Sequence, residues 1–294
     1  MFGLALDDAG AVAVRVGDGG VEARASTPAD GDLAAAASRA LGEVGAGSGT
    51  PQLGVASVVP DSPAVAAALA QLAQRFSGSF TTDGALSAGL AAAVAEAWNG
   101  AARGVRDVVL FAVGAHAIGG VVRSGVPVMG ARGRAGSVGW VSLNPVERED
   151  YRKVGCVEAE VAAAGIVRRM IWRIKAGDRS RVQDAVNDDL GAITVDHILA
   201  AARANDGVSI SVIRDTAKYL GMAAANLVAI ADPQMLVLGG IMASSSDLLL
   251  EPIRHELARR LPKGMMDGLK IETAALGDDA AAIGAARLAG ATLP

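Results

Sequence analysis

The chain has 294 residues, 51% of them hydrophobic and 20% charged, with a formal net charge of −4 at pH 7. A chain of this length and composition can bury a full core, which excludes an intrinsically disordered protein. The basic residues are dispersed rather than clustered, so we expect no direct nucleic-acid binding.

The apolar runs of the sequence are too short for membrane insertion. Gly, Asp or Arg breaks each run well before the roughly 20 residues that a membrane span requires. Asp7 and Asp8 lie where a signal peptide would need an unbroken apolar stretch. The single cysteine, Cys156, cannot close a disulfide within the chain. We therefore expect a cytoplasmic protein without membrane contact.

The first hundred residues predict a β-meander followed by alternating strands and helices. Short β-type runs are separated by acidic, glycine-rich turns. The strands are expected at 2–6, 11–16, 21–26 and 54–59. The helices are expected near 31–45, 62–76 and 85–103.

The same opening returns about a hundred residues later, which predicts a duplicated architecture. The strands are expected at 105–113, 118–124, 126–130 and 235–240. The helices are expected near 157–176, 194–205, 208–231 and from about 246, with Pro252 near the first turn of the last one. ALGDDAAAIGAARLA then forms an Asp-capped, Ala-rich closing helix.

Two duplicated units of alternating strands and helices predict a two-lobed α/β protein with a cleft between the lobes. We place the N-terminal lobe at 1–104 and the C-terminal lobe at 105–278. The closing helix, about 279–294, is expected to pack back on the first lobe.

Four segments resemble the ROK family of repressors, open reading frames and kinases in residue type and order. They are residues 91–114, 225–240, 247–257 and 274–286. The resemblance implies the actin/hexokinase-like (ribonuclease H-like) ATPase fold with duplicated βββαβα units. It also implies an ancestry among ATP-dependent sugar kinases, and a homodimer formed through the second lobe.

In active members of that family, one turn in each lobe holds the ATP phosphates. The first family turn has paired glycines and Thr-Lys, whereas ALDDAG (5–10) has neither Thr nor Lys and brings in Asp7 and Asp8. At about 4 Å and an effective dielectric near 20, like charges cost on the order of 4 kcal/mol, so this turn should repel a triphosphate unless a metal intervenes. The alternative is an ordinary acidic hairpin turn.

The second family turn is Gly-Thr-Gly and reads Gly114-Ala115-His116 in this chain. A bulky imidazole therefore stands where backbone should approach a phosphate oxygen. His116 is either a ligand contact or a histidine that belongs to an ordinary turn. Gly239 and Gly240 match the segment beside the adenosine, so with Gly114 they are the remaining candidates for a nucleotide contact.

The family's catalytic base lies in an Asn-Asp pair, and ungapped counting places Ser87 and Ala88 there. Alanine cannot accept a proton. Asp83 is the nearest carboxylate, and it would need an insertion of about four residues to reach the same place. It is either a relocated base or a turn or N-cap residue before the helix.

The family's sugar-contacting Glu-x-Gly-His reads Ser137-Val138-Gly139-Trp140. Both the carboxylate and the imidazole are lost, and Trp140 would either stack on a sugar face or plug the pocket. Glu158 matches a remaining sugar-binding Glu of the family, and the alternative for it is a solvated Glu in the first turn of a helix. The resemblance makes Glu158, Trp140, Ser137 and His116 the candidate ligand residues.

The family's structural zinc uses three cysteines and an upstream histidine. Only Gly155 and Cys156 match that run, with Glu149 and Tyr151 at the other two cysteine positions. This set does not make a closed tetrahedral site, so we expect no metal. The loop at 144–153 is then either held by ion pairs or mobile.

Several independent losses favour a sugar kinase-like protein without catalysis that binds a small sugar-like ligand or acts as a regulatory or scaffolding subunit. No cofactor is expected in this case. A helix-turn-helix domain would precede the first strand in the family's repressors, so direct transcription control is not expected.

Two further hypotheses stay open. The first is an active kinase of a sugar or sugar-like metabolite that uses ATP, magnesium and Asp83. The second is other chemistry at Cys156, His116 or His197, although the sequence pairs none of these residues.

Overall fold

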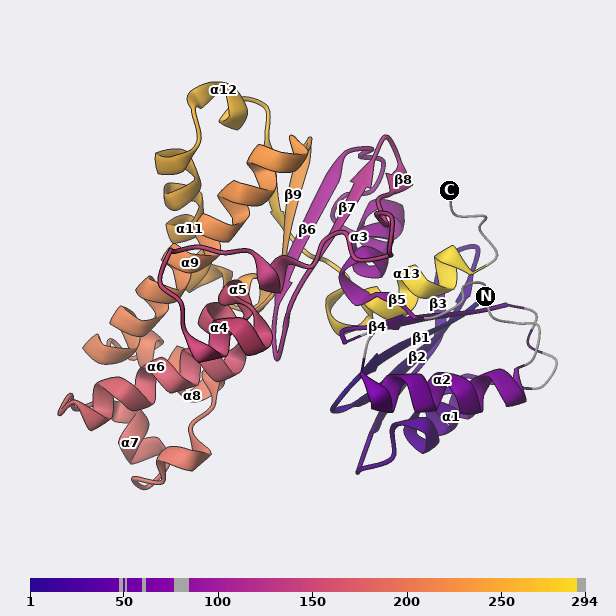
Figure 1. Ribbon diagram of the computed structural model, residues 1–294, viewed down its shortest axis with the longest axis horizontal. Helices are drawn as coiled ribbons and strands as arrows, with labels where there is room; N and C mark the ends of the chain where they lie inside the picture. The colour runs from indigo at the N-terminus through magenta and orange to yellow at the C-terminus, as the bar shows by residue number, and fades with distance from the viewer. Residues whose placement is uncertain (48–49, 51, 60–61, 77–84, 290–294) are drawn as a thin grey trace.

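Two five-stranded sheets with the same strand order form the frame of the molecule (Figure 1). The computed structural model describes residues 1–47, 50, 52–59, 62–76 and 85–289. The strands of the first sheet are β1 (Phe2–Asp7), β2 (Gly10–Gly17), β3 (Gly20–Pro28), β4 (Leu53–Ser57) and β5 (Leu86–Ser87). The strands of the second are β6 (Val108–Val113), β7 (Ala117–Arg123), β8 (Val126–Pro127), β9 (Met235–Gly240) and β10 (Lys270–Thr273).

The topology confirms the predicted duplication. The first sheet runs β3-β2-β1-β4-β5 and the second runs β8-β7-β6-β9-β10, so the strands correspond one to one. In each sheet the first strand pairs antiparallel with the second and parallel with the fourth. The chain is therefore the predicted two-lobed α/β protein.

Helices pack against both faces of the two sheets. Those of the first half and the closing helix are α1 (Leu33–Glu43), α2 (Pro63–Arg75), α3 (Ala88–Asn99) and α13 (Ala280–Leu288). Those of the second half are α4 (Glu149–Val154), α5 (Cys156–Val161), α6 (Ala163–Lys175), α7 (Arg181–Ala185), α8 (Val195–Arg203), α9 (Gly207–Ala231), α10 (Ile241–Ser244), α11 (Ser246–Arg260) and α12 (Lys263–Met266). No helix among the described residues is long and apolar enough to cross a membrane.

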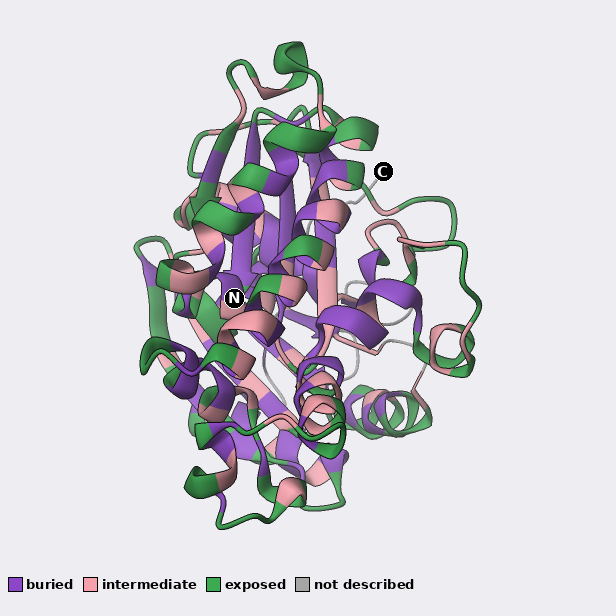
Figure 2. Ribbon diagram, turned by 90° about the vertical axis from the view of Figure 1, so that its left-hand side faces the viewer, coloured by how far each residue is buried: buried purple, intermediate pink, exposed green. Residues whose placement is uncertain are grey.

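The core follows the alternation of strand side chains. Val108 and Leu110 of β6 pack in one cluster with α3 and α13, whereas Val109 and Phe111 pack in another with α9 and α11. In the first sheet, Leu4 of β1 packs with α1 and α2. Figure 2 shows buried residues along the strands and inner helix faces and exposed ones on the outer faces. The helices α3 and α13 thus lie between the two sheets.

Close backbone contacts at glycine positions hold the layer that α3 and α13 form between the sheets. A Cβ on Gly284 of α13 would lie 1.7 Å from the Ala91 carbonyl oxygen of α3. A Cβ on Gly89 of α3 would lie 2.1 Å from the Gly119 carbonyl oxygen of β7. Because α13 also contacts β1 and β4, this helix packs against the first sheet as predicted, and residues 290–294 of the expected closing helix lie outside the described residues. The expected domain boundary after residue 104 lies between α3 and β6 and stays a prediction.

Three predicted elements are wrong in extent. The helix expected at 85–103 covers only Ala88–Asn99, because Leu86–Ser87 pair with β4 as strand β5. The helix expected at 157–176 is broken at Ala162, whose backbone is extended (φ −66°, ψ 159°). A Cβ on Gly165 would lie 2.2 Å from the Ala159 carbonyl oxygen, so glycine lets α6 turn back closely against α5. The strand expected at 126–130 ends at Pro127, after which the chain leaves the sheet.

Two predicted helix starts are wrong in detail. Pro252 lies inside α11 rather than near its first turn. Asp279 precedes α13, but its side chain makes no cap hydrogen bond and accepts one from Arg24 of β3 at 2.7 Å. Asp279 therefore does not supply the side-chain cap that was predicted for this helix.

Candidate functional site

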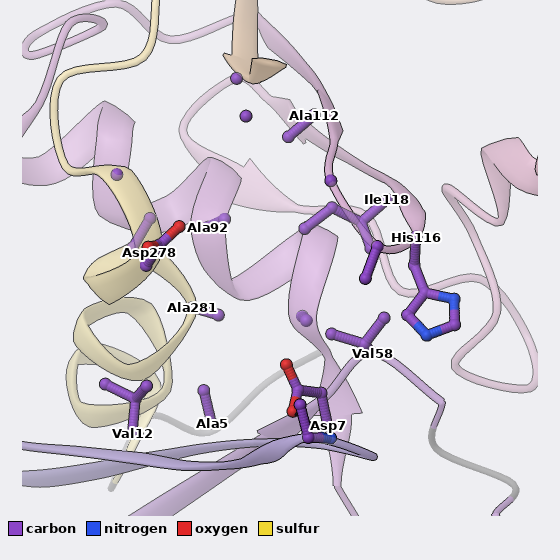
Figure 3. Close-up of a pocket in the computed structure, with 18 of the residues that line it drawn as sticks. Ala5, Asp7, Val12, Val58, Ala92, Ala112, His116, Ile118, Asp278 and Ala281 are labelled. Atoms are coloured by element: carbon purple, nitrogen blue, oxygen red, sulfur yellow. Dashed lines mark hydrogen bonds between the residues drawn. The ribbon is translucent and has the colours of Figure 1, made fainter. Parts of the chain in front are cut away.

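A cavity of about 1050 Å³ opens between the two lobes (Figure 3). Its lining comes from the β1–β2 turn and the β6–β7 turn, from the end of β9, and from α3 and the loop before α13. Both turns that the ROK resemblance assigns to phosphate binding therefore meet at one cavity. The cleft that the sequence predicted is open.

In the first turn, the Asp7 carboxylate binds backbone amides of the residues that follow it. Its Oδ1 accepts hydrogen bonds from the N–H groups of Ala9 at 2.8 Å and Gly10 at 2.7 Å. Asp7 lines the cavity, and Asp8 beside it is exposed. The amides of a glycine-rich turn are the groups that would bind a phosphate, and here a carboxylate of the chain already occupies two of them.

The second turn brings together two of the candidate ligand residues. His116 Nδ1 lies 2.8 Å from Glu158 Oε1, and the Ala117 N–H donates to Glu158 Oε2 at 2.6 Å. The hydrogen bond to Glu158 raises the pKa of His116 above its ordinary value, against the opposing effect of burial, and Asp8 and Asp7 add to the rise. His116 lines the cavity and Glu158 does not. Glu158 therefore acts on the cavity through the imidazole.

The local backbone explains how Glu158 reaches this place. Gly155, at the start of α5, has φ +99°, and a Cβ there would lie 2.2 Å from the Gly139 carbonyl oxygen. Glycine thus lets α5 begin directly against the short 3₁₀ turn of residues 138–140. The first turn of α5 then carries Glu158 to the β6–β7 turn.

The start of α3 carries no proton acceptor toward the cavity. Ala88 is its first residue, lines the cavity and is almost fully buried. Ser87 precedes it, and Asp83 lies outside the residues that the structure describes. Ala88 therefore lies at the cavity wall, and the predicted loss of the base stays a prediction.

The other two candidate ligand residues lie away from the cavity lining. Ser137 Oγ donates to the Arg134 carbonyl oxygen at 2.8 Å. Trp140 is 60% exposed, so its ring does not plug the cavity. The exposed ring does not support the plugging alternative, and stacking on a ligand stays a prediction.

Three predicted glycines line the cavity together. Gly114 belongs to the second turn, and Gly239 and Gly240 end β9. Gly240 has φ +62°, and a Cβ there would lie 1.9 Å from the Val113 carbonyl oxygen, so only glycine fits. These residues form a smooth backbone wall opposite the first turn.

An ion-pair network holds the loop that matches the family's zinc run. Glu160 accepts from Arg148 at 3.0 Å, Arg169 at 2.7 Å and the Tyr151 hydroxyl at 2.5 Å. Cys156 is buried, and no group of three or more His, Cys, Asp or Glu in the described part of the chain could hold a metal ion. Of the two alternatives for the loop at 144–153, the ion pairs are the one that the structure shows.

Sequence reasoning missed two charged groups at the cavity. Arg24 lines it from β3 and binds Asp279, and Asp278 lines it from the loop before α13. The sequence signal was present in GDDAAAIGAA, but we interpreted both aspartates only as helix-start residues. The local sequence does not encode the packing that places Asp278 in the cavity lining and Asp279 against Arg24.

Two sheets of identical topology around a cleft, with one turn from each sheet at its rim, define the actin- and hexokinase-like class of proteins. The model of the ROK family matches residues 56–292. This chain belongs to the ROK family.

Curated relatives include both kinases and repressors. A glucokinase from Halalkalibacterium halodurans is 34% identical over 197 residues, which are 66% of this chain and 59% of that protein. A xylose repressor from Caldicellulosiruptor bescii is 30% identical over 200 residues, 66% of this chain and 48% of that protein. The matches thus span about half to three fifths of these relatives.

Solved structures share the fold across nearly the whole chain. A ROK family glucokinase from Streptomyces griseus, in complex with glucose and AMPPNP, has a TM-score of 0.78 at 22% identity over 98% of both chains. A ROK hexokinase from Thermus thermophilus has a TM-score of 0.72 at 23% identity and covers 98% of this chain and 97% of its own.

Proposed function

We propose that this protein is a ROK-family sugar kinase-like protein without kinase activity, which binds a small sugar-like ligand in the cleft and acts in a regulatory or scaffolding role. The observation that carries the proposal is Ala88 at the cavity wall, in the place that the family gives to its base. Loss of a general base typically lowers the rate by about 10²–10⁴.

The first turn supports the same proposal. Phosphoryl transfer depends mainly on positioning and on electrostatic stabilisation of the phosphates. In this chain the Asp7 carboxylate takes the amides of Ala9 and Gly10, and the turn supplies no cation. A nucleotide would meet negative charge where an active kinase offers donors.

The candidate sugar contacts lie beside the second turn. His116 reaches the cavity with Glu158 behind it, and Trp140 exposes its ring. The hydroxyl groups of a sugar can form hydrogen bonds with an imidazole, and the sugar ring can stack on an indole. The neighbouring structure solved with glucose and AMPPNP and the xylose repressor named above make a sugar-like ligand the first class to test.

A coupled assay of ADP release with a panel of sugars tests the absence of catalysis, with the glucokinase of Halalkalibacterium halodurans as the positive control. We expect no sugar-dependent turnover. A thermal shift with a sugar, without ATP and magnesium, supports a binding role because a ligand of the native state raises the apparent stability. Turnover that disappears in Asp83→Ala would establish the alternative, an active kinase with a relocated base.

We also propose a homodimer formed through the second lobe. The proposal follows the ROK resemblance and the common preference of soluble proteins for twofold assemblies. Light scattering behind a sizing column checks it, with a mass of twice 29.4 kDa as the expected result. A monomer at micromolar concentration would contradict it.

A further inference from the structure

The wall of the cavity is built mostly from small apolar residues. Its alanines come from both lobes, so the wall is smooth and offers few polar groups. They are Ala5, Ala9, Ala11, Ala88, Ala92, Ala112, Ala115, Ala243, Ala274, Ala275, Ala280 and Ala281. A cavity of about 1050 Å³ with such a wall takes a drug-sized organic molecule and desolvates most of it.

The cationic groups at the cavity already have carboxylate partners. Among the described residues, two basic side chains line it, Arg24 and His116. Arg24 Nε lies 2.7 Å from Asp279 Oδ1, and His116 Nδ1 lies 2.8 Å from Glu158 Oε1. A ligand anion would have to compete with these partners for each cation.

The remaining charged groups of the lining are acidic. Asp7 occupies the amides of Ala9 and Gly10, which are the donors that a phosphate would need. Asp278 is exposed, lines the cavity, and makes no hydrogen bond or ion pair with any described residue. Figure 3 shows Asp7 at the first sheet and Asp278 beside α13. With the partners Asp279 and Glu158 counted, four carboxylates stand against two basic side chains, so the cavity carries excess negative charge in either protonation state of His116.

We propose that this cavity selects an uncharged, hydroxyl- or amino-bearing molecule of nucleoside size and rejects phosphorylated molecules of the same shape. The inference rests on the proposed function and names the ligand class of the same cleft. Asp278 offers a free acceptor, and the hydroxyls of Ser26, Thr27 and Ser244 can both accept and donate, so the wall suits a neutral ligand with hydroxyl or amino groups. Each added phosphate brings negative charge, and both basic side chains of the described lining are already paired with carboxylates.

Adenosine and AMPPNP are matched probes because they share the nucleoside and differ in the triphosphate. Calorimetric titrations at low ionic strength should give adenosine at least about tenfold higher affinity than AMPPNP, with and without magnesium, and the gap should narrow as salt screens the carboxylates. Equal affinities, tighter binding of AMPPNP, or no binding of adenosine would each overturn the proposal.

Two aspartate-to-asparagine variants test whether the negative charge of the lining causes the selectivity. Asp7→Asn and Asp278→Asn keep a carbonyl oxygen at each position and remove one negative charge each. The double variant should lower the ratio of the AMPPNP to the adenosine dissociation constant severalfold, whereas Asp18→Asn, in the β2–β3 turn away from the cavity lining, should leave it unchanged. An unchanged ratio in the double variant would contradict the inference.

The outcome is distinguishable from that of the proposed function. Sugar-dependent ADP release overturns the absence of catalysis. Equal affinity for the two probes without turnover overturns only the charge selectivity.

Discussion

His116 and Glu158 are 42 positions apart in the chain and share one hydrogen bond at the cavity rim. Because that bond and the negative charge of Glu158 raise the pKa of His116, Glu158→Gln should bring the pKa back toward its ordinary value near 6.5. NMR titration of the histidine ring protons measures the change, and His197, on α8, is the internal control.

The raised pKa also fixes the direction of the pH effect. A raised folded-state pKa means that the pair stabilises the protein fully below the ordinary histidine pKa. That stabilisation is lost as pH rises through the folded-state pKa. An identical His116 pKa in Glu158→Gln would show that the two residues are not coupled.

Asp206 joins two helices through one carboxylate. It caps α9 by accepting from the Ser209 N–H at 2.9 Å, and it accepts from Ser180 Oγ at 2.8 Å and the Arg181 N–H at 3.1 Å beside α7. Burial alone would raise the pKa of Asp206, but these hydrogen bonds together lower it. We expect Asp206→Asn to cost about 1–3 kcal/mol at pH 7.

Urea unfolding at several pH values tests the direction of the Asp206 pKa shift. Because the folded-state pKa of Asp206 is lowered, its contribution is present at neutral pH and lost as pH falls through that pKa. The stability difference between wild type and Asp206→Asn should therefore shrink in acid. A difference that grows in acid would refute the assignment.

At the scale of the element, the ion pairs of Glu160 hold the segment from α4 to α6. The Glu160 side chain is only 5% exposed and lies against Arg148 and Arg169. Burial, and next the hydrogen bond to Glu160, raise the pKa of Tyr151 to about 12, so this hydroxyl stays a donor across the physiological range.

Removing metal should therefore leave the stability unchanged, whereas removing the carboxylate should not. EDTA is expected to leave the Tm as it is, and Glu160→Gln is expected to cost about 1–3 kcal/mol because two half-buried guanidinium groups lose a buried carboxylate partner. Differential scanning calorimetry measures both, with Glu149→Gln as the control because its ion pair with Lys153 is exposed. A fall in Tm with EDTA would indicate a structural metal.

Sequence patterns located most elements because burial repeats with the period of each one. The meander of β1, β2 and β3 follows from alternation and glycine turns. Periodicity does not reveal the corner at Ala162, since Gly165 permits it only by its contact with the carbonyl oxygen of Ala159. The short strand β10 was missed because its four residues gain their stability from pairing with β9.

The candidate site was predictable only where a motif carried it. The carboxylates of the first turn and Ala88 were visible as departures from a family pattern. The contact between Glu158 and His116 was not, because it depends on α5 beginning against the 138–140 turn. The exposed side chain of Trp140 likewise follows from packing between elements.

At the scale of the whole molecule, the two lobes meet through backbone contacts that tolerate no side chain. A Cβ on Gly89 of α3 would lie 2.1 Å from the Gly119 carbonyl oxygen, and one on Gly120 of β7 would lie 2.2 Å from the Gly89 carbonyl oxygen. Neighbouring backbone cannot give way as a flexible side chain can. Gly89→Ala must therefore move α3 against the second sheet.

We expect Gly89→Ala to cost about 1–3 kcal/mol or more, because overpacking forces backbone shifts. Gly207→Ala is the matched control, since nothing lies within 4 Å of its added methyl group at the start of α9, and alanine there should be neutral or slightly stabilising. Urea denaturation measures both variants. Because the same contact sets the spacing of the lobes, Gly89→Ala should also weaken binding of the cleft ligand, and equal stability of the two variants would show that the lobes are not fixed at this contact.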